Sequence, residues 1–171
     1  MSKTVKSVWN AISWLLILAV VALAVLLAGV RLVGLTPYTV LSGSMEPVYP
    51  VGSLIYVRGA EPQSIAVGDP ITFVLNEDLT VATHRVVDID LEKHLFYTKG
   101  DANDAPDGAP VHFNNLIGRP VFCIPKLGYL SAWISAPPGT YITICAAVIL
   151  LVLIFLPEWL EKAERADREK S

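Results

Sequence analysis

A serine, a histidine and a group of aspartates lie far apart along this chain and together could perform serine-protease chemistry. Ser44 follows Gly43 in the turn-forming segment 41–47, and the adjacent glycine leaves the hydroxyl accessible to a carbonyl group. A serine hydroxyl is a weak nucleophile at neutral pH, so it requires a base. An imidazole can accept its proton and pass it to the leaving amine. Taken alone, the segment is more typical of an ordinary Ser/Gly turn.

His84 is the candidate base. It lies in the alternating run 81–89, where it shares one strand face with Ala82 and Val86, and a histidine in such a place is more often structural. A carboxylate on the second ring nitrogen would fix the tautomer and stabilise the imidazolium. A loop rich in Gly, Pro and Asn supplies three such carboxylates: Asp101, Asp104 and Asp107.

Composition narrows the classes of protein to which the chain can belong. Hydrophobic residues make up 53% and charged residues 17% of the chain, with a mean hydropathy of +0.52, which excludes a disordered charged tail and indicates membrane segments. The net charge of −3 argues against nucleic-acid binding. The two cysteines, Cys123 and Cys145, lack CxxC spacing, and the aspartate loop lacks the EF-hand pattern, so we expect neither metal nor disulfide.

Two uncharged stretches could cross a bilayer. Residues 8–30 would form a helix of roughly 35 Å, enough for a hydrocarbon core. This stretch exceeds the apolar region of a cleavable signal peptide, so we expect an uncleaved anchor, although residues 22–24 resemble a cleavage site. The second stretch is densest at 141–156 and is flanked by aromatic residues, Tyr129, Trp133, Tyr141 and Trp159. A buried helix of a soluble domain is its alternative interpretation.

These features predict five consecutive segments. Basic residues near the ends of the spans place both termini in the cytoplasm. The segments are a cytoplasmic N-terminus (1–7), a transmembrane anchor (8–35), an extracytoplasmic domain (36–138), a second transmembrane helix (139–157) and a charged cytoplasmic tail (158–171).

The middle segment is predicted to be mostly β. Short runs of β-branched and aromatic residues alternate with turn residues, among them the turn 76–78. A domain of this size with several short strands indicates a small antiparallel sheet or a partly closed barrel. The expected strands are 53–58, 71–75, 81–89, 95–98 and 121–124.

Four motifs then occur in an order that resembles the type I signal peptidases. They are Ser42–Pro47, Gly68–Phe73, Thr83–Val86 and Thr98–Asp101. The resemblance covers about residues 38–124. Within the family, the sequence is more similar to the endoplasmic-reticulum type, which is found in archaea, in some Gram-positive bacteria and in the catalytic subunit of the eukaryotic complex. In that type a histidine replaces the lysine base, and no lysine occurs here between Lys6 and Lys93. The resemblance implies a signal-peptidase-like catalytic domain between the two spans.

The resemblance also implies roles for individual residues. Ser44 would be the nucleophile and His84 the general base, with Asp107 as the partner of the histidine and Asp101 as a supporting carboxylate. The loop departs from the family's Gly-Asp-Asn-Asn pattern, and Asp104 is an additional acid. Asp104 therefore remains a competitor for the role of partner.

The same resemblance implies the remaining parts of the reaction. The oxyanion would be held by the backbone N–H of Ser44 and the hydroxyl of Ser42, without any cofactor. The partners would be preproteins that carry signal peptides and the lipid bilayer, with the secretion translocon nearby. No nucleic-acid partner is expected. Residues 38–41 and 79–82 are candidates for pockets that select small side chains such as Ala.

Two other functions compete with this interpretation. The chain could be a catalytically silent, membrane-anchored assembly or regulatory module of the same fold. It could also be a sortase-type transpeptidase with Cys123 as the nucleophile. However, Cys123 lies in the apolar run 121–125, where a cysteine is typical of core packing.

Overall fold

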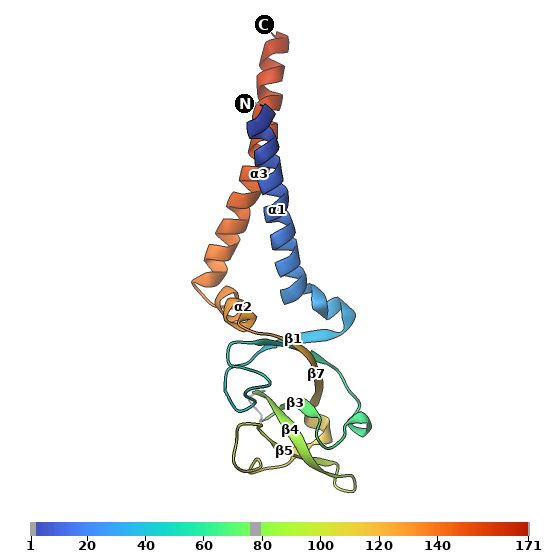
Figure 1. Cartoon of the computed structure of the whole chain (residues 1–171). Helices are drawn as coiled ribbons and strands as arrows, with labels where there is room; N and C mark the ends of the chain where they lie inside the picture. The colour runs from blue at the N-terminus through green and yellow to red at the C-terminus, as the bar shows by residue number, and fades with distance from the viewer. Residues whose placement is uncertain (1–2, 76–79, 171) are drawn as a thin grey trace. The chain divides into compact units, whose positions relative to one another are not determined.

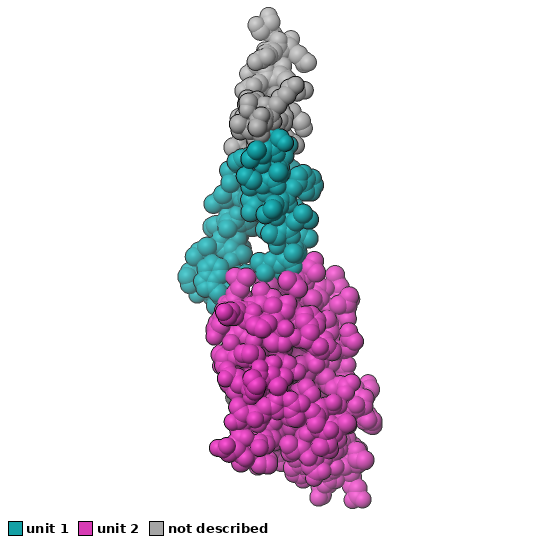
Figure 2. Space-filling model, in the orientation of Figure 1, with its two compact units in different colours: residues 1–23, 133–171 teal, residues 24–132 magenta. Residues whose placement is uncertain are grey.

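The computed structural model of the chain describes residues 3–75 and 80–170. The predicted turn 76–78 and Leu79 lie outside the described residues. The chain divides into two compact units, which Figure 2 colours separately. The unit formed by residues 24–132 contains the whole sheet. The other unit is helical and combines residues up to 23 with residues from 133 onward.

The first apolar stretch forms helix α1, Lys3–Leu27. Within it, Ser7–Leu27 is 21 residues long with a mean hydropathy of 2.6, enough to cross a membrane. The chain then continues as the 3₁₀ helix η1, Gly29–Val33. The hydroxyl of Tyr56 donates to the carbonyl of Leu26 at 2.8 Å, which satisfies a helix-end acceptor and ties the end of α1 to the sheet.

The second apolar stretch forms two helices, α2 (Leu127–Ser135) and α3 (Gly139–Lys170). This stretch is long and apolar enough to cross a membrane only if Leu127–Ser135 and Gly139–Phe155 are taken together as one span. The two parts are bent by 92° relative to each other. Pro137 and Pro138 fall at the bend, and proline interrupts helical hydrogen bonding. One clear membrane-length helix is therefore found among the described residues, and a second transmembrane helix is not confirmed.

A curled, antiparallel seven-stranded sheet forms the body of unit 24–132 (Figure 1). Its strand order is β1-β2-β7-β3-β4-β5-β6, and two short 3₁₀ helices, η2 (Pro62–Ser64) and η3 (Phe113–Asn115), interrupt its connections. The prediction of a mostly β, partly closed domain is confirmed. The strands are β1 (Leu35–Thr39), β2 (Leu54–Arg58), β3 (Pro70–Val74), β4 (Val81–Asp90), β5 (Leu95–Lys99), β6 (Val111–His112) and β7 (Leu116–Ile124).

The sequence patterns missed β1, β6 and the first half of β7. Pro37 lies within β1, and Gly118 and Pro120 lie within β7, residue types that argue against a strand when tertiary context is unknown. At Gly118 the register between β7 and β3 shifts. A Cβ there would lie 2.0 Å from the carbonyl oxygen of Arg58, so only glycine allows β2 and β7 to approach this closely.

The main apolar cluster lies against β3, β4 and β5 and holds the strand that carries the candidate base. Val86 on β4 is 1% exposed, and Ala82 packs against the same cluster. The alternation predicted for this strand is confirmed from Ala82 to Val86, where it fixes the direction in which His84 points. After Val86 a bulge breaks the alternation, so that Asp88 is exposed and Ile89 packs against the same cluster. The buried members are Ile65, Ile71, Phe73, Val86, Phe96, Val111 and Phe113.

Candidate active site

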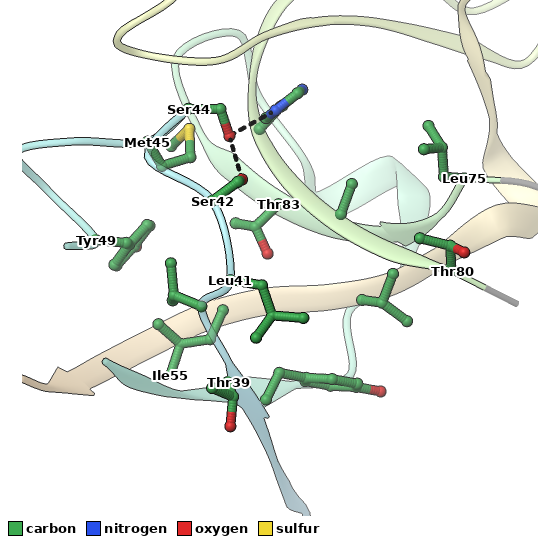
Figure 3. A pocket seen from close by; sticks show the side chains of 15 residues that line it. Thr39, Leu41, Ser42, Ser44, Met45, Tyr49, Ile55, Leu75, Thr80 and Thr83 are labelled. Carbon is green, nitrogen blue, oxygen red and sulfur yellow. Dashed lines mark hydrogen bonds between the residues drawn. The ribbon is translucent and has the colours of Figure 1, made fainter. Parts of the chain in front are cut away.

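Ser44 lies in a compact turn that follows β1. Met45 is 2% exposed and anchors the turn in the interior, while its carbonyl accepts from the N–H of Tyr49 at 2.9 Å and the Gly43 carbonyl accepts from Glu46 at 3.0 Å. With the backbone held in this way, the Ser44 hydroxyl faces a cavity, where dashed lines join it to Ser42 and to an imidazole ring (Figure 3).

That imidazole belongs to His84 and bridges two of the predicted site residues. Its Nε2 lies 3.1 Å from Oγ of Ser44, and its Nδ1 lies 2.5 Å from Oδ2 of Asp107. The ring is set by β4, where His84 pairs with Ile71 of β3, and the ring edge faces Phe73 at 6.2 Å between centroids. The His84 and Asp107 side chains are 16% and 22% exposed, so water screens this contact only partly.

Asp107 is placed by the end of β5. Its backbone N–H donates to the carbonyl of Thr98 at 2.8 Å, and its Oδ2 accepts from the hydroxyl of Thr98 at 2.7 Å. Asp104 is exposed, as is most of the loop around it. Of the three aspartates in the loop, Asp107 is the one in contact with the His84 ring.

Asp101 contacts a guanidinium group and not the imidazole. Nε and Nη2 of Arg85 donate to Oδ1 and Oδ2 of Asp101 at 2.7 and 2.6 Å. This hydrogen bonding lowers the pKa of Asp101 and raises that of Arg85. Asp101 is thus an ionised neighbour of the site.

The aspartate loop also touches the serine directly. The backbone N–H of Ala102 donates to the carbonyl of Ser44 at 2.9 Å. A Cβ at Gly100 would lie 2.6 Å from that same carbonyl oxygen, so the residue must be glycine for the loop to approach so closely. The hydroxyl of Ser42 lies 3.3 Å from Oγ of Ser44.

A cavity of about 780 Å³ opens beside the serine. Two segments form most of its walls: residues 38–42, before the serine turn, and residues 80–84, at and just before the start of β4. The two segments predicted to line pockets, 38–41 and 79–82, do line this cavity, except for Leu79, which lies outside the described residues. Met45, Tyr49, Ile55 and Leu75 complete the lining, and burial raises the pKa of Tyr49.

In the described sheet, β1 and residues 81–84 of β4, which line the cavity, each have a single partner strand. In the described sheet, β1 pairs with β2 on one side, and residues 81–84 of β4 pair with β3. Pairing of β4 with β5 begins only at Arg85, opposite Lys99. An extended peptide in the cavity could therefore hydrogen-bond to main chain on either wall.

The sequence patterns missed the roles of Thr98 and Arg85. Thr98 is the first residue of the motif Thr98–Asp101, and Arg85 directly follows His84 in the motif Thr83–Val86. Their places in these motifs were the only signal in the sequence. Cys123, the rival nucleophile, is half-buried on β7 opposite Ile55 of β2. The arrangement can activate the Ser44 hydroxyl by proton transfer to a carboxylate-oriented imidazole.

Comparison with known proteins adds a second, independent line of observation. No family model matches the chain. The chain is 46% identical over 86 residues to signal peptidase I W of Bacillus subtilis, covering 48% of this chain and 45% of that protein. It is 32% identical over 108 residues to the signal peptidase complex catalytic subunit SEC11 of Zygosaccharomyces rouxii, covering 56% and 64% respectively.

A more distant relative extends the matched region. SEC11 of Plasmodium falciparum is 29% identical over 126 residues, and the match covers 67% of each chain. The chain therefore spans between about half and two thirds of the lengths of these curated relatives.

Proposed function

We propose that this chain, which is related in sequence to the type I signal peptidases, is a membrane-bound serine endopeptidase that removes N-terminal signal peptides from exported preproteins. One observation carries the proposal: the two ring nitrogens of His84 contact Ser44 Oγ and Asp107 Oδ2. A histidine between a hydroxyl and a carboxylate is the arrangement that activates a serine for acyl transfer.

In the proposed reaction, Ser44 Oγ attacks the scissile carbonyl carbon while its proton moves to Nε2 of His84. The negative charge of Asp107 stabilises the resulting imidazolium. The imidazolium then gives its proton to the leaving amine as the C–N bond breaks, which leaves an acyl enzyme on Ser44. Water, deprotonated by the same nitrogen, hydrolyses this ester and releases the signal peptide.

The oxyanion would be stabilised by the backbone N–H of Ser44 and the hydroxyl of Ser42. The separation of 3.3 Å between the two hydroxyl oxygens supports this role, because a carbonyl attacked by Ser44 would lie within reach of Ser42. Donors that are already in place cost no reorganisation when the charge develops.

The preprotein would lie in the cavity as an extended strand between residues 38–42 and 80–84. Main-chain hydrogen bonds to β1 and to residues 81–84 of β4 would give affinity without sequence preference. Selection of small side chains would then come from the apolar lining of the cavity, which includes Ile55 and Met45. A large residue placed there would meet these side chains before its carbonyl reached Ser44.

A membrane location suits this substrate. α1 would anchor the chain, with both termini in the cytoplasm and the sheet outside, and α2 with α3 would form a second, bent span. The segment from Val30 to Ser44 reaches at most roughly 50 Å when fully extended, so the nucleophile stays near the outer face of the lipid bilayer. Signal peptides end there, close to the secretion translocon, and tethering both partners to one surface raises their effective concentration.

The test is cleavage of a model preprotein by the full chain in detergent or lipid, with the new N-terminus of the product sequenced. Ser44→Ala and His84→Ala should each lower the rate at least a thousandfold, as loss of a triad member does, and leave the circular dichroism spectrum unchanged. A fully active His84→Ala variant would eliminate the proposed base.

Two results would favour the rival functions. A folded wild-type chain that cleaves no preprotein would indicate a catalytically silent assembly or regulatory module. Loss of cleavage on alkylation of Cys123 would point to the cysteine as nucleophile, whereas we expect alkylation to leave the rate unchanged.

A further inference from the structure

We infer that Thr98 is a positioning residue of the proposed active site, acting through Asp107 as a fourth member of the Ser44–His84–Asp107 chain. This inference rests on the proposed function. It starts from an atom that the triad shares: Oδ2 of Asp107 accepts from the hydroxyl of Thr98 at 2.7 Å and contacts Nδ1 of His84 at 2.5 Å.

Thr98 is suited to hold a carboxylate still. It is 1% exposed and is the last but one residue of β5, opposite Val86 of β4, so strand pairing fixes its backbone. It holds Asp107 twice, since its carbonyl accepts from the Asp107 N–H at 2.8 Å while its hydroxyl donates to the side chain. Both the backbone and the carboxylate of Asp107 are therefore set by one buried residue.

The reaction makes use of this rigidity. Rotation about the terminal torsion of an aspartate is broad and soft, so a carboxylate with one hydrogen bond can turn away from its histidine. Two donors on the same oxygen remove that freedom. The carboxylate then faces Nδ1 of His84 already when the Ser44 proton arrives, and the imidazolium is stabilised without reorganisation.

The neighbouring guanidinium of Arg85 does not hold the carboxylate of Asp107 in this way. Arg85 is engaged by Asp101 through two hydrogen bonds, and its remaining Nη1 donates to the carbonyl of Gly68 at 2.7 Å. Within the described residues, the side chains that hydrogen-bond to the carboxylate of Asp107 are therefore those of Thr98 and His84.

Two variants separate the hydroxyl from the rest of the side chain. Thr98→Val keeps the packing volume and removes the donor, whereas Thr98→Ser keeps the donor and removes a buried methyl group. We expect Thr98→Val to lower kcat about 10- to 100-fold, the range for a hydrogen bond to a charged group, with KM unchanged. Thr98→Ser should keep kcat within about threefold of wild type although it unfolds more readily.

A double-mutant cycle tests whether the effect passes through Asp107. Single-turnover cleavage by excess enzyme is measured for both Thr98 variants in the wild-type and Asp107→Ala backgrounds. We expect Thr98→Val to cause no further loss when Asp107 is absent. Equal losses in the two backgrounds, or a wild-type kcat in Thr98→Val, would overturn the inference.

A spectroscopic measurement separates this inference from the proposed function. The ring ¹⁵N chemical shifts of His84, assigned with His84→Ala, should move in Thr98→Val and stay near wild type in Thr98→Ser. If the wild-type chain cleaves nothing but the shifts move as expected, the proposed function fails and the positioning role stands. Unmoved shifts in Thr98→Val would contradict the positioning role whether or not the chain is active.

Discussion

The guanidinium of Arg85 holds both carboxylate oxygens of Asp101, at 2.7 and 2.6 Å. Arg85 directly follows His84 on β4, and Asp101 directly follows Gly100 in the loop that leads to Asp107. This bidentate pair therefore joins the strand of the proposed base to the loop of the proposed acid. Two parallel charge-assisted bonds give such a pair directional rigidity as well as energy.

The pair predicts how stability depends on pH. Hydrogen bonding to Arg85 lowers the pKa of Asp101 below its ordinary value of 3.8. A carboxylate whose pKa is lowered by folding stabilises the fold above its unfolded pKa, and this contribution is lost as the pH falls through the folded value. We expect Asp101→Asn to unfold more readily than wild type at pH 7, with the difference between them shrinking below about pH 4.

Thermal unfolding of the full chain in detergent between pH 7 and pH 2.5 would measure this difference. Asp104→Asn is the matched control, because Asp104 is an exposed residue of the same loop, and its stability should follow that of wild type at every pH. A difference between Asp101→Asn and wild type that stays constant down to the lowest pH would refute the assignment.

Replacing each of the three loop aspartates by asparagine should lower kcat to a different extent. Asp107→Asn should lower kcat by about 10⁴-fold, as an amide in place of the triad carboxylate selects the wrong tautomer. Asp104→Asn should leave kcat unchanged. Asp101→Asn should fall between them, because it releases Arg85 beside His84 without touching the ring. Side-by-side rates on one preprotein test this order, and an inactive Asp104→Asn with an active Asp107→Asn would reverse the assignment.

Two glycines of the same loop offer a test of how the loop supports the serine. Gly100→Ala should lower kcat at least tenfold, because the new Cβ would lie 2.6 Å from the Ser44 carbonyl oxygen and must displace it or the loop. A Cβ at Gly108 meets no heavy atom within 4 Å, so Gly108→Ala should behave as wild type. Equal activity of the two variants would show that contact with the Ser44 carbonyl is unimportant.

The hydroxyl of Ser42 is expected to contribute only in the transition state. Ser42→Ala should lower kcat by ~10²–10³-fold with little change in KM, the usual cost of losing one oxyanion donor. Its 3.3 Å separation from Ser44 Oγ is the geometric basis for this prediction. Steady-state kinetics on a peptide substrate would decide; a variant that raises KM alone would assign Ser42 to substrate binding.

Ser53 is a position where the fold can be made more stable. The residue is 0% exposed, and within the described part of the chain its hydroxyl has no hydrogen-bond partner. Ser53→Ala should keep or raise the free energy of unfolding, by up to about 1 kcal/mol. Thr72→Val is the matched control, since that buried hydroxyl lies 2.8 Å from the hydroxyl of Thr83, and should lose about 1 kcal/mol. Urea unfolding in detergent measures both, and a less stable Ser53→Ala would contradict the prediction.

Local patterns were sufficient for the parts of the fold that depend on neighbours in sequence. The apolar run 8–30 predicted α1 because a helix of that length buries itself in lipid without help from other residues. The alternation at 81–89 predicted β4 and the face of His84, since a strand's two-residue period depends on its own backbone alone. Strands that contain Pro37, Gly118 or Pro120 were missed, because their extended conformation depends on pairing with strands that are distant in sequence.

The candidate site divides in the same way. Residue types and motif order singled out Ser44, His84 and a loop with three acids, because chemistry restricts which side chains can serve as nucleophile and base. Which acid meets the histidine could not be read from spacing, since a loop of this length can present any of the three. Only the path of the chain between Gly100 and Asp107, closed by the Thr98 hydrogen bonds, brings Asp107 to His84 and leaves Asp104 in solvent.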